Sequence, residues 1–299
     1  MSNGFKVRLA QRSQEIESYL EQCLQVEDIP EQLRQAMEYS LLAGGKRMRP
    51  VLCLAWGEML GVSKREILSF AAGLEFMHTY SLVHDDLPAM DNDDTRRGKP
   101  TNHKVYGEAL AILTGDALLT QAFYMMLSTS LTPARVLPAC REVAHAAGPW
   151  GMVGGQCLDT LATGQGIMDV QALKNMHAMK TGALIRAACC SGAVLAGHEP
   201  GESSAHFQNA GQYGTNIGLA FQIMDDVLDV TGDEEALGKP VGSDVTSDKS
   251  TYPKFLGLEK SRELAQESVD QALLSLQGYH GEHKEFLRDL AQYIVDRAS

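Results

Sequence analysis

The chain has 299 residues, and 26 lysines and arginines against 38 aspartates and glutamates give a net charge of −12. This acidic balance argues against a nucleic-acid partner, because proteins that bind nucleic acids present clustered basic residues and have a high isoelectric point. The hydrophobic fraction of 44% and the charged fraction of 21% are typical of a globular protein and exclude a disordered or fibrous chain. Six cysteines show no C-x-x-C spacing, so neither a disulfide framework nor a zinc site is predicted.

Helical periodicity dominates the chain in sequence order. In the first periodic segment, apolar residues recur three and four positions apart, and Gly44 and Gly45 then end the helix. No run of alternating β-branched residues occurs, so we predict an all-α fold in which strands are at most minor. The predicted helical segments include 33–41, 108–131, 171–195, 265–276 and 287–294.

Short stretches containing glycine and proline separate these segments, and the longest irregular one lies near 232–250. None is typical of a long flexible linker, so we predict a single domain over residues 1–299. The first 25 residues lack the apolar core of a signal peptide. The apolar stretch 182–197 is too short for a membrane span and contains Arg186. We therefore expect a soluble, cytoplasmic protein without stable membrane insertion.

A first acidic motif lies in the segment 82–100, LVHDDLPAMDNDDTRRGKP, which packs five aspartates into ten residues and ends in two arginines. Carboxylates this close repel one another and need cations to stay ionised in a shielded site. A cluster of oxygen ligands suits Mg²⁺ or Ca²⁺, but Arg96 stands where an EF-hand needs glycine. Since Mg²⁺ also takes phosphate oxygens, the arginines favour a phosphorylated ligand, and a solvated acidic loop is the alternative.

A second acidic motif, FQIMDDVLD, occupies residues 221–229. Asp225 and Asp229 are four residues apart, so on a helix their Cβ atoms share one face at roughly 5–6 Å. Apolar neighbours indicate that this face points inward, where two carboxylates can hold a metal ion. A surface pair of charges is the alternative.

A basic motif, GGKRMRP, occupies residues 44–50 and contains Lys46, Arg47 and Arg49. It is not a phosphate-binding P-loop, because the upstream glycine is missing and Arg47 stands where serine or threonine is required. Two interpretations remain: a clamp for a diphosphate, or cations that favour the C-terminal end of the preceding helix.

Single residues near these motifs are informative only in combination. His78 precedes Asp85 by seven residues, which is about two helical turns, so both side chains can face one cavity. Tyr80 precedes Asp85 by five residues, and packing in the core is the ordinary explanation for both His78 and Tyr80. An exposed surface position is the ordinary explanation for Lys180, Thr181, Lys239 and Lys249.

The two aspartate motifs, spaced by four residues in the first and two in the second, are more specific together than either alone. With GGKRMRP they resemble the trans-isoprenyl diphosphate synthases, and most of all the bacterial farnesyl diphosphate synthases. The resemblance runs from about residue 33 to the C-terminus and includes HAMKTGALIRAA at 177–188 and GKPVGSDVTSDKSTYP at 238–253. It implies one polyprenyl synthase domain, folded as an all-α isoprenoid synthase-type bundle around a deep central cavity.

The resemblance also implies roles for individual residues. Three Mg²⁺ ions would bind, when substrate is present, to Asp85, Asp86, Asp91, Asp225 and Asp229. The allylic diphosphate would be held by Arg96, Lys180, Lys239 and Lys249. Isopentenyl diphosphate would be held by Lys46, Arg49, His78 and Arg97. The allylic cation would be stabilised by the dipoles of Thr181 and Gln222, which together with Lys180, Asp85 and Asp225 form the implied catalytic set.

The implied reaction joins isopentenyl diphosphate to dimethylallyl or geranyl diphosphate by ionisation, condensation and elimination, with Mg²⁺ and cationic side chains stabilising the departing diphosphate. In the bacterial farnesyl pattern a bulky residue stands five positions before the first aspartate. Here that residue is Tyr80, followed by Ser81, and the resemblance therefore implies a C15 product, farnesyl diphosphate. A homodimer is implied as well.

Alternatives differ in the motifs that they require. The same chemistry could continue to a C20 product, geranylgeranyl diphosphate. A class I terpene cyclase would carry an Asn/Asp-Ser/Thr-Glu metal motif in place of the second aspartate cluster. A non-catalytic subunit of a heteromeric prenyl synthase usually has degraded aspartate motifs, whereas both motifs are complete in this chain.

Overall fold

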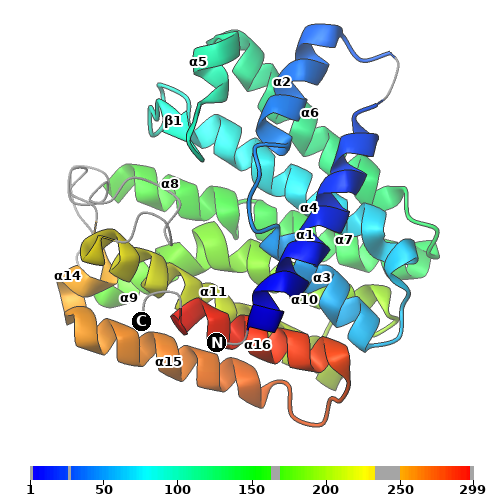
Figure 1. The fold of residues 1–299 in the computed structure, drawn as a ribbon, viewed down its shortest axis with the longest axis vertical. Helices are drawn as coiled ribbons and strands as arrows, with labels where there is room; N and C mark the ends of the chain where they lie inside the picture. Colours follow the sequence, from blue (N-terminus) through cyan, green and yellow to red (C-terminus); the bar gives the residue numbers. More distant parts are fainter. Residues whose placement is uncertain (1–2, 26–27, 163–168, 233–249, 297–299) are drawn as a thin grey trace.

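The computed structural model describes residues 3–25, 28–162, 169–232 and 250–296. This part of the chain is built from helices, apart from one hairpin of two-residue strands (Figure 1). The prediction of an all-α fold is thereby confirmed. The first helix of the described chain, α1, contacts the last one, α16 (Figure 1).

The helices of the N-terminal half are α1 (Asn3–Cys23), α2 (Glu31–Leu41), α3 (Met48–Met59), α4 (Lys64–Asp85), α5 (Asn102–Tyr106), α6 (Glu108–Leu127), α7 (Pro133–Ala147) and α8 (Met152–Ala162). Those of the C-terminal half are α9 (Val170–His177), the π-helical turn η1 (Ala178–Gly182), α10 (Ala183–Leu195), α11 (Ala205–Thr231), α14 (Tyr252–Leu256), α15 (Leu258–Leu274) and α16 (Glu282–Asp296). The hairpin strands are β1 (Thr95–Arg96) and β2 (Lys99–Pro100), which pair antiparallel.

The helical segments predicted from periodicity coincide with α2, α6, α9 with α10, α15 and α16. Their ends differ from the predicted ones by up to seven residues: α6 stops at Leu127 rather than Leu131, and α15 begins at Leu258 rather than Ala265. The predicted helix over 171–195 contains a π-helical turn at Ala178–Gly182. Apolar periodicity does not reveal such a turn, because a π-helical turn changes the hydrogen-bond register without changing the residue types.

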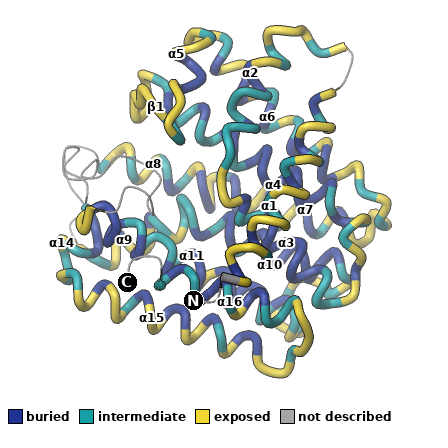
Figure 2. The backbone as a smooth tube through the Cα atoms, in the orientation of Figure 1, coloured by how far each residue is buried: buried dark blue, intermediate teal, exposed yellow. Residues whose placement is uncertain are grey.

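Four helices form the buried centre, and these are α3, α4, α10 and α11 (Figure 2). Most of α3 and almost all of α10 is buried, as expected for helices that other helices surround. Their crossing depends on a glycine, because a Cβ at Gly192 would lie 2.5 Å from the carbonyl oxygen of Cys53. The buried apolar side chains of these helices belong to one core cluster.

Helix α4 begins at a capping box and carries residues of both the basic and the acidic predicted groups. Ser63 precedes the helix, and its backbone N–H donates to the side chain of Glu66 (3.2 Å), which also accepts from the Ser63 hydroxyl. Its 22 residues extend about 33 Å, from this cap to the first aspartate motif. The helix thus holds His78, Tyr80 and Asp85 in one fixed register.

Helix α6 is apolar on both of its faces. Its inner face packs against α4, whereas Ile112, Leu113, Tyr124 and Leu127 are exposed on its outside. By length and composition alone α6 could cross a membrane, and 39% of its most apolar window is buried within the protein. From the sequence, residues 182–197 were named as the most apolar stretch, whereas among the described residues the helix long and apolar enough to span a membrane is α6.

Candidate active site

The first aspartate motif begins at the C-terminal end of α4 and continues into the following loop. Asp85 is the last residue of the helix and Asp86 is its C-cap. The loop then folds back, because the backbone N–H of Asp91 donates to the carbonyl of Asp85 at 2.9 Å and Asn92 adopts a positive φ of 54°. Asp91 therefore lies next to Asp85 at the end of the helix, although the two are six positions apart in the sequence.

The carboxylate of Asp85 lies in an unfavourable environment for its negative charge. Burial raises the pKa of Asp85 to about 6, Lys180 and Arg96 oppose this shift, and Asp91 and Asp86 add to it. A cation bound between these oxygens would remove the repulsion, and carboxylate oxygens are ligands that Mg²⁺ prefers. The donor set therefore fits Mg²⁺, although in the described ranges no three acidic, histidine or cysteine side chains are already assembled around a metal position.

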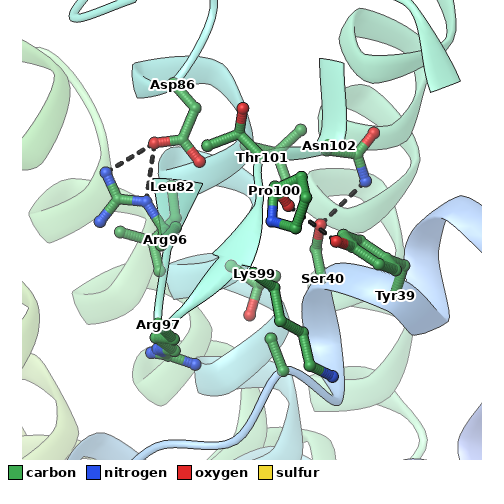
Figure 3. Close-up of a pocket in the computed structure, with 13 residues that line it drawn as sticks. Tyr39, Ser40, Leu82, Asp86, Arg96, Arg97, Lys99, Pro100, Thr101 and Asn102 are labelled. Carbon is green, nitrogen blue, oxygen red and sulfur yellow. Dashed lines mark hydrogen bonds and ion pairs between the residues drawn. The ribbon is translucent and has the colours of Figure 1, made fainter. Parts of the chain in front are cut away.

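Arg96 lies on β1 and is held by the acidic motif itself (Figure 3). Its Nε donates to Oδ1 of the buried Asp86 at 2.7 Å, and its NH2 group lies 3.4 Å from Oδ2 of Asp93. The hairpin turn that follows has a positive φ at both Arg97 (53°) and Gly98 (74°), as in a type I′ turn. Arg96, which was predicted to bind the allylic diphosphate, is thus placed beside Asp86 as its counterion.

The hairpin is fastened to α2 around a small cavity of about 30 Å³ (Figure 3). Tyr39 donates to the carbonyl of Pro100 (2.7 Å), and the amide of Asn102 donates to the Ser40 hydroxyl (2.8 Å). Such a volume holds one or two water molecules and no isoprenoid. A second pocket, of about 460 Å³, lies at the surface beside Tyr19 and Ser128. Neither of these is the deep central cavity, which stays a prediction.

Three of the predicted basic residues lie together between α3, the hairpin turn and α4. Burial lowers the pKa of Arg49 to about 10, and its Nε atom is shielded from solvent and has no hydrogen-bond partner among the described residues. Burial also lowers the pKa of His78 well below its usual range, and the positive charges of Arg49 and Arg97 lower it further. This neutral histidine and two arginines form a pocket of positive potential that an anion would stabilise.

Lys46 occupies a different position from the other basic residues. It is exposed, and its ammonium lies 5.8 Å from the ring centroid of Tyr293 on α16. Arg97 is connected to the same basic motif, because its NH1 group donates to the carbonyl of Gly44. The loop at 44–47 thus lies between α16 on one side and the hairpin turn on the other.

Lys180 is brought to the first aspartate motif by the π-helical turn η1. Burial lowers the pKa of Lys180, but Asp159, Asp85 and Asp91 outweigh that effect and raise it, so the side chain stays cationic. Its Nζ lies 2.6 Å from Oδ2 of Asp159 on α8. Thr181 follows Lys180 in the same turn.

The approach of α8 to η1 requires a glycine. A Cβ at Gly155 would lie 2.2 Å from the backbone nitrogen of Lys180, so no other residue fits there without displacing the turn. The side chain of Gln156, the next residue on α8, has both amide atoms buried, and neither has a hydrogen-bond partner within the part of the chain that the structure describes. Helix α8 therefore supplies a tight wall beside Lys180 and the counterion Asp159.

The second aspartate motif lies on α11 together with Gln222. Asp229 is only 1% exposed, whereas Asp225 is partly exposed. Asp226 has a structural partner, since its carboxylate accepts a hydrogen bond from the backbone N–H of Tyr252 (2.9 Å) and so anchors α14. Lys239 and Lys249 lie outside the described residues.

Reasoning from the sequence missed two acidic residues beside the site, Asp159 and Glu75. Asp159 pairs with Lys180, and Glu75 pairs with Arg47 at 2.7 Å. The run GGQCLD at 154–159 carried a usable signal, because paired glycines inside a helix indicate a close contact at that point. Glu75 had no comparable signal beyond being a charge within an apolar segment.

These features define a helical protein in which a group of arginines and a group of carboxylates lie along one central helix. The polyprenyl synthetase family matches residues 30–290, and the chain belongs to this family. It is a prenyltransferase, and its family uses isoprenyl diphosphate substrates, generally with Mg²⁺.

Relatives of known sequence cover almost the whole chain. A chloroplastic geranylgeranyl pyrophosphate synthase of Capsicum annuum is 42% identical over 296 residues, which is 98% of this chain and 79% of the relative. A dimethylallyltranstransferase of Fischerella ambigua is 46% identical over 292 residues, which is 97% of this chain and 82% of the relative. Several other relatives carry the name geranylgeranyl synthase, so the resemblance to farnesyl synthases in particular is not confirmed.

Solved structures agree with the fold. The apo structure of an FPP/GFPP synthase from Zymomonas mobilis matches with a TM-score of 0.86 and 37% identity, covering 98% of this chain and 100% of that one. A geranyltransferase from Legionella pneumophila matches with a TM-score of 0.86 and 34% identity, covering 98% and 97%. The described helices therefore form the bundle of the isoprenyl synthases.

Gly155→Ala tests the contact between α8 and the turn that carries Lys180. The added methyl group would displace η1, and we expect kcat/KM for prenyl transfer to fall at least about 100-fold, because misplacement by about 1 Å has such effects. The exposed Cys157→Ala on the same helix should leave kcat/KM unchanged. Steady-state kinetics measure both variants, and wild-type activity in Gly155→Ala would contradict this interpretation of the contact.

Proposed function

We propose that this protein condenses isopentenyl diphosphate with dimethylallyl or geranyl diphosphate to give farnesyl diphosphate. The observation that carries the proposal is the arrangement along α4, where His78 faces partly buried arginines and Asp85, about two turns later, faces other carboxylates. Arginines bind a diphosphate directly, whereas carboxylates bind one through divalent cations. Helix α4 thus carries a proposed site for direct binding of one diphosphate at His78 and a proposed site for metal-mediated binding of another at Asp85.

The basic end of the site suits the diphosphate of isopentenyl diphosphate. Arg49 and Arg97 carry positive charge that is partly shielded from water, so a diphosphate placed between them would gain strong charge-assisted hydrogen bonds. His78 stays neutral beside these arginines and adds a donor without repelling them. Lys46 would contribute from the exposed rim of the loop at 44–47.

The acidic end suits the allylic diphosphate. The residues that would hold Mg²⁺ are Asp85, Asp91 and Asp225, assisted by Asp86 and Asp229. When bound there, Mg²⁺ supplies positive charge that stabilises the departing diphosphate.

Cationic and dipolar side chains complete this end of the site. Lys180 adds its own cation next to Asp85, and Arg96 would reach the same diphosphate from its place beside Asp86. Thr181 and Gln222 would orient their dipoles toward the allylic carbon, and Lys239 and Lys249 complete the proposed set.

Incubation of the purified full chain with isopentenyl diphosphate, geranyl diphosphate and Mg²⁺ tests this function. A C15 diphosphate should form, and EDTA should abolish it. Asp225→Asn should lower kcat at least about 100-fold through weakened metal binding, whereas the exposed Asp270→Asn on α15 should match the wild type. If the chain alone forms no product, the alternative of a non-catalytic subunit is favoured instead.

The length of the product is the finer part of the proposal. Tyr80 is 7% exposed, and its ring packs edge-on against His84 with centroids 6.0 Å apart. His84 is in turn held by α6, since its Nε2 lies 3.0 Å from the carbonyl of Ile112 and its ring fills the space that a Cβ at Gly115 would need. A bulky side chain fixed in this way, with Ser81 beside it, supports a wall that stops the chain at C15.

Names of relatives favour the competing C20 product, because several are geranylgeranyl synthases. The two products can be separated at Tyr80. Tyr80→Ala should remove the wall and extend the product to C20 or longer, whereas Tyr80→Phe keeps the ring and should retain C15. Chromatography of the dephosphorylated products measures this outcome. A wild-type C20 product, or a Tyr80→Ala variant that still stops at C15, would contradict the role of Tyr80.

The outer face of α6 supports a homodimer. Ile112, Leu113, Tyr124 and Leu127 are between 46% and 65% exposed, and an apolar face of this kind marks an interaction surface. Asp116 is exposed on the same helix, and a carboxylate there disfavours insertion into lipid. A second copy of the chain is therefore the proposed occupant, and the cytoplasmic location remains part of the proposal on the sequence alone.

Leu113→Glu tests this interface, because it places a charge in the centre of the apolar face. The molar mass of the wild type in solution should be twice the 32.5 kDa of one chain, and Leu113→Glu should have the mass of a monomer. Leu274→Glu on α15, where the leucine is similarly exposed, should stay dimeric. Sedimentation velocity at micromolar concentration measures all three, and a monomeric wild type would refute the proposed dimer.

A further inference from the structure

Arg47, the middle cation of the basic motif, behaves differently from its neighbours. Its side chain is fully buried, whereas Lys46 directly before it is exposed. Its backbone has a φ of 47° and a ψ of 38°, the left-handed conformation, at the N-cap of α3. A residue other than glycine keeps this conformation only where the surrounding structure enforces it.

Three helices meet at the guanidinium of Arg47. Its NH1 group donates to Oε1 of Glu75 on α4 at 2.7 Å, and its NH2 group donates to the carbonyl of Leu41 at the end of α2 at 2.8 Å. Its Nε donates to Oε1 of Glu17 on α1 at 3.3 Å. All three nitrogens of the guanidinium are thus bonded to protein groups, and the side chain is fully buried.

Glu75 connects this buried pair to the basic pocket. Its carboxylate is 3% exposed and lies on α4 three residues before His78, so the two side chains share one face of the helix. Its negative charge also acts on Arg49 and Arg97, where it opposes the effect of burial. Glu75 is therefore a buried carboxylate that faces all three arginines of this region.

The loop held by Arg47 also fixes the groups on either side of it. Arg49 follows two residues later in the first turn of α3. Arg97 donates to the carbonyl of Gly44, which lies three residues before Arg47 in the same loop. A shift of this loop would therefore move both arginines together. Lys180 is held by a different partner, Asp159 on α8.

We propose that Arg47 and Glu75 form a positioning pair for the isopentenyl diphosphate half of the site. Neither contacts the substrate. The pair fixes the loop at 44–47 and the start of α3 against α4, and so orients Arg49 and Arg97 toward one diphosphate. This inference rests on the proposed function. It makes the two halves of the site separable, because the pair supports the homoallylic substrate and leaves the allylic one unaffected.

The test uses two conservative variants that separate charge from geometry. Arg47→Lys keeps the positive charge but cannot bridge three partners, and Glu75→Gln keeps the shape but loses the negative charge. Each should raise KM for isopentenyl diphosphate about 10-fold or more, with KM for geranyl diphosphate within about twofold of wild type. In the double variant the KM for isopentenyl diphosphate should be no higher than in the worse single one, because both act through one contact.

Glu58→Gln provides the matched control, since Glu58 forms a similar interhelical ion pair with Arg12 (2.8 Å) at the other end of α3. It should lower Tm and leave both KM values unchanged. If Arg47→Lys does not fold, Glu17→Gln tests the same loop, and a rise in KM for isopentenyl diphosphate alone supports the proposal there too.

Two results would overturn the positioning role. One is a lowered Tm in Arg47→Lys and Glu75→Gln with an unchanged KM for isopentenyl diphosphate; the other is an equal rise of both KM values. Calorimetric binding of isopentenyl diphosphate to wild type and variants gives a readout that needs no turnover. If the wild type binds but forms no product, the proposed function fails while the positioning role is still judged from affinity.

Discussion

Buried charge along α4 is the constraint on which the rest of this structure depends. Within 12 residues the helix carries Glu75, His78, Asp85 and Asp86, all removed at least in part from water. A charge in such a place requires a partner, and neighbouring elements supply Arg47 for Glu75 and Arg96 for Asp86. Asp85 instead has a raised pKa, and His78 stays neutral. Removal of one member of a buried pair typically costs about 3–5 kcal/mol, so these pairs determine how α3 and the hairpin dock.

The apolar architecture follows from the same constraint. Helices α3, α10 and α11 are buried over much of their length and pack closely, with Gly192 letting α10 approach the backbone of α3. This dense centre gives α4 a rigid support, and rigidity is what keeps several like charges at fixed positions. Loops alone would relax and let the charges return to water.

Much of the fold and part of the site could be predicted from the sequence. Apolar periodicity located α2, α6, α15 and α16, and the aspartate and basic motifs named residues that the structure places near one another, such as Arg49, His78 and Arg97. Pairings between distant segments were not predictable. Asp159 and Glu75 meet Lys180 and Arg47 only through packing, and no local pattern records that contact. The same holds for Arg96, whose pairing with Asp86 was not predicted, while its predicted role toward the allylic diphosphate stays a prediction.

The π-helical turn η1 has a consequence for the phase of the helix that contains it. In a regular α-helix each residue is rotated by about 100° from the one before, so a single extra residue in a turn rotates everything after it by that angle. The side chains of α9 and α10 are therefore out of rotational phase with each other, although the two helices follow one another in the sequence without a break. The buried face of α10 can remain in the core while Lys180 points to Asp159, because the phase changes between them. The extra residue in η1 thus lets one continuous helical segment pack α10 into the core and also direct Lys180 toward Asp159.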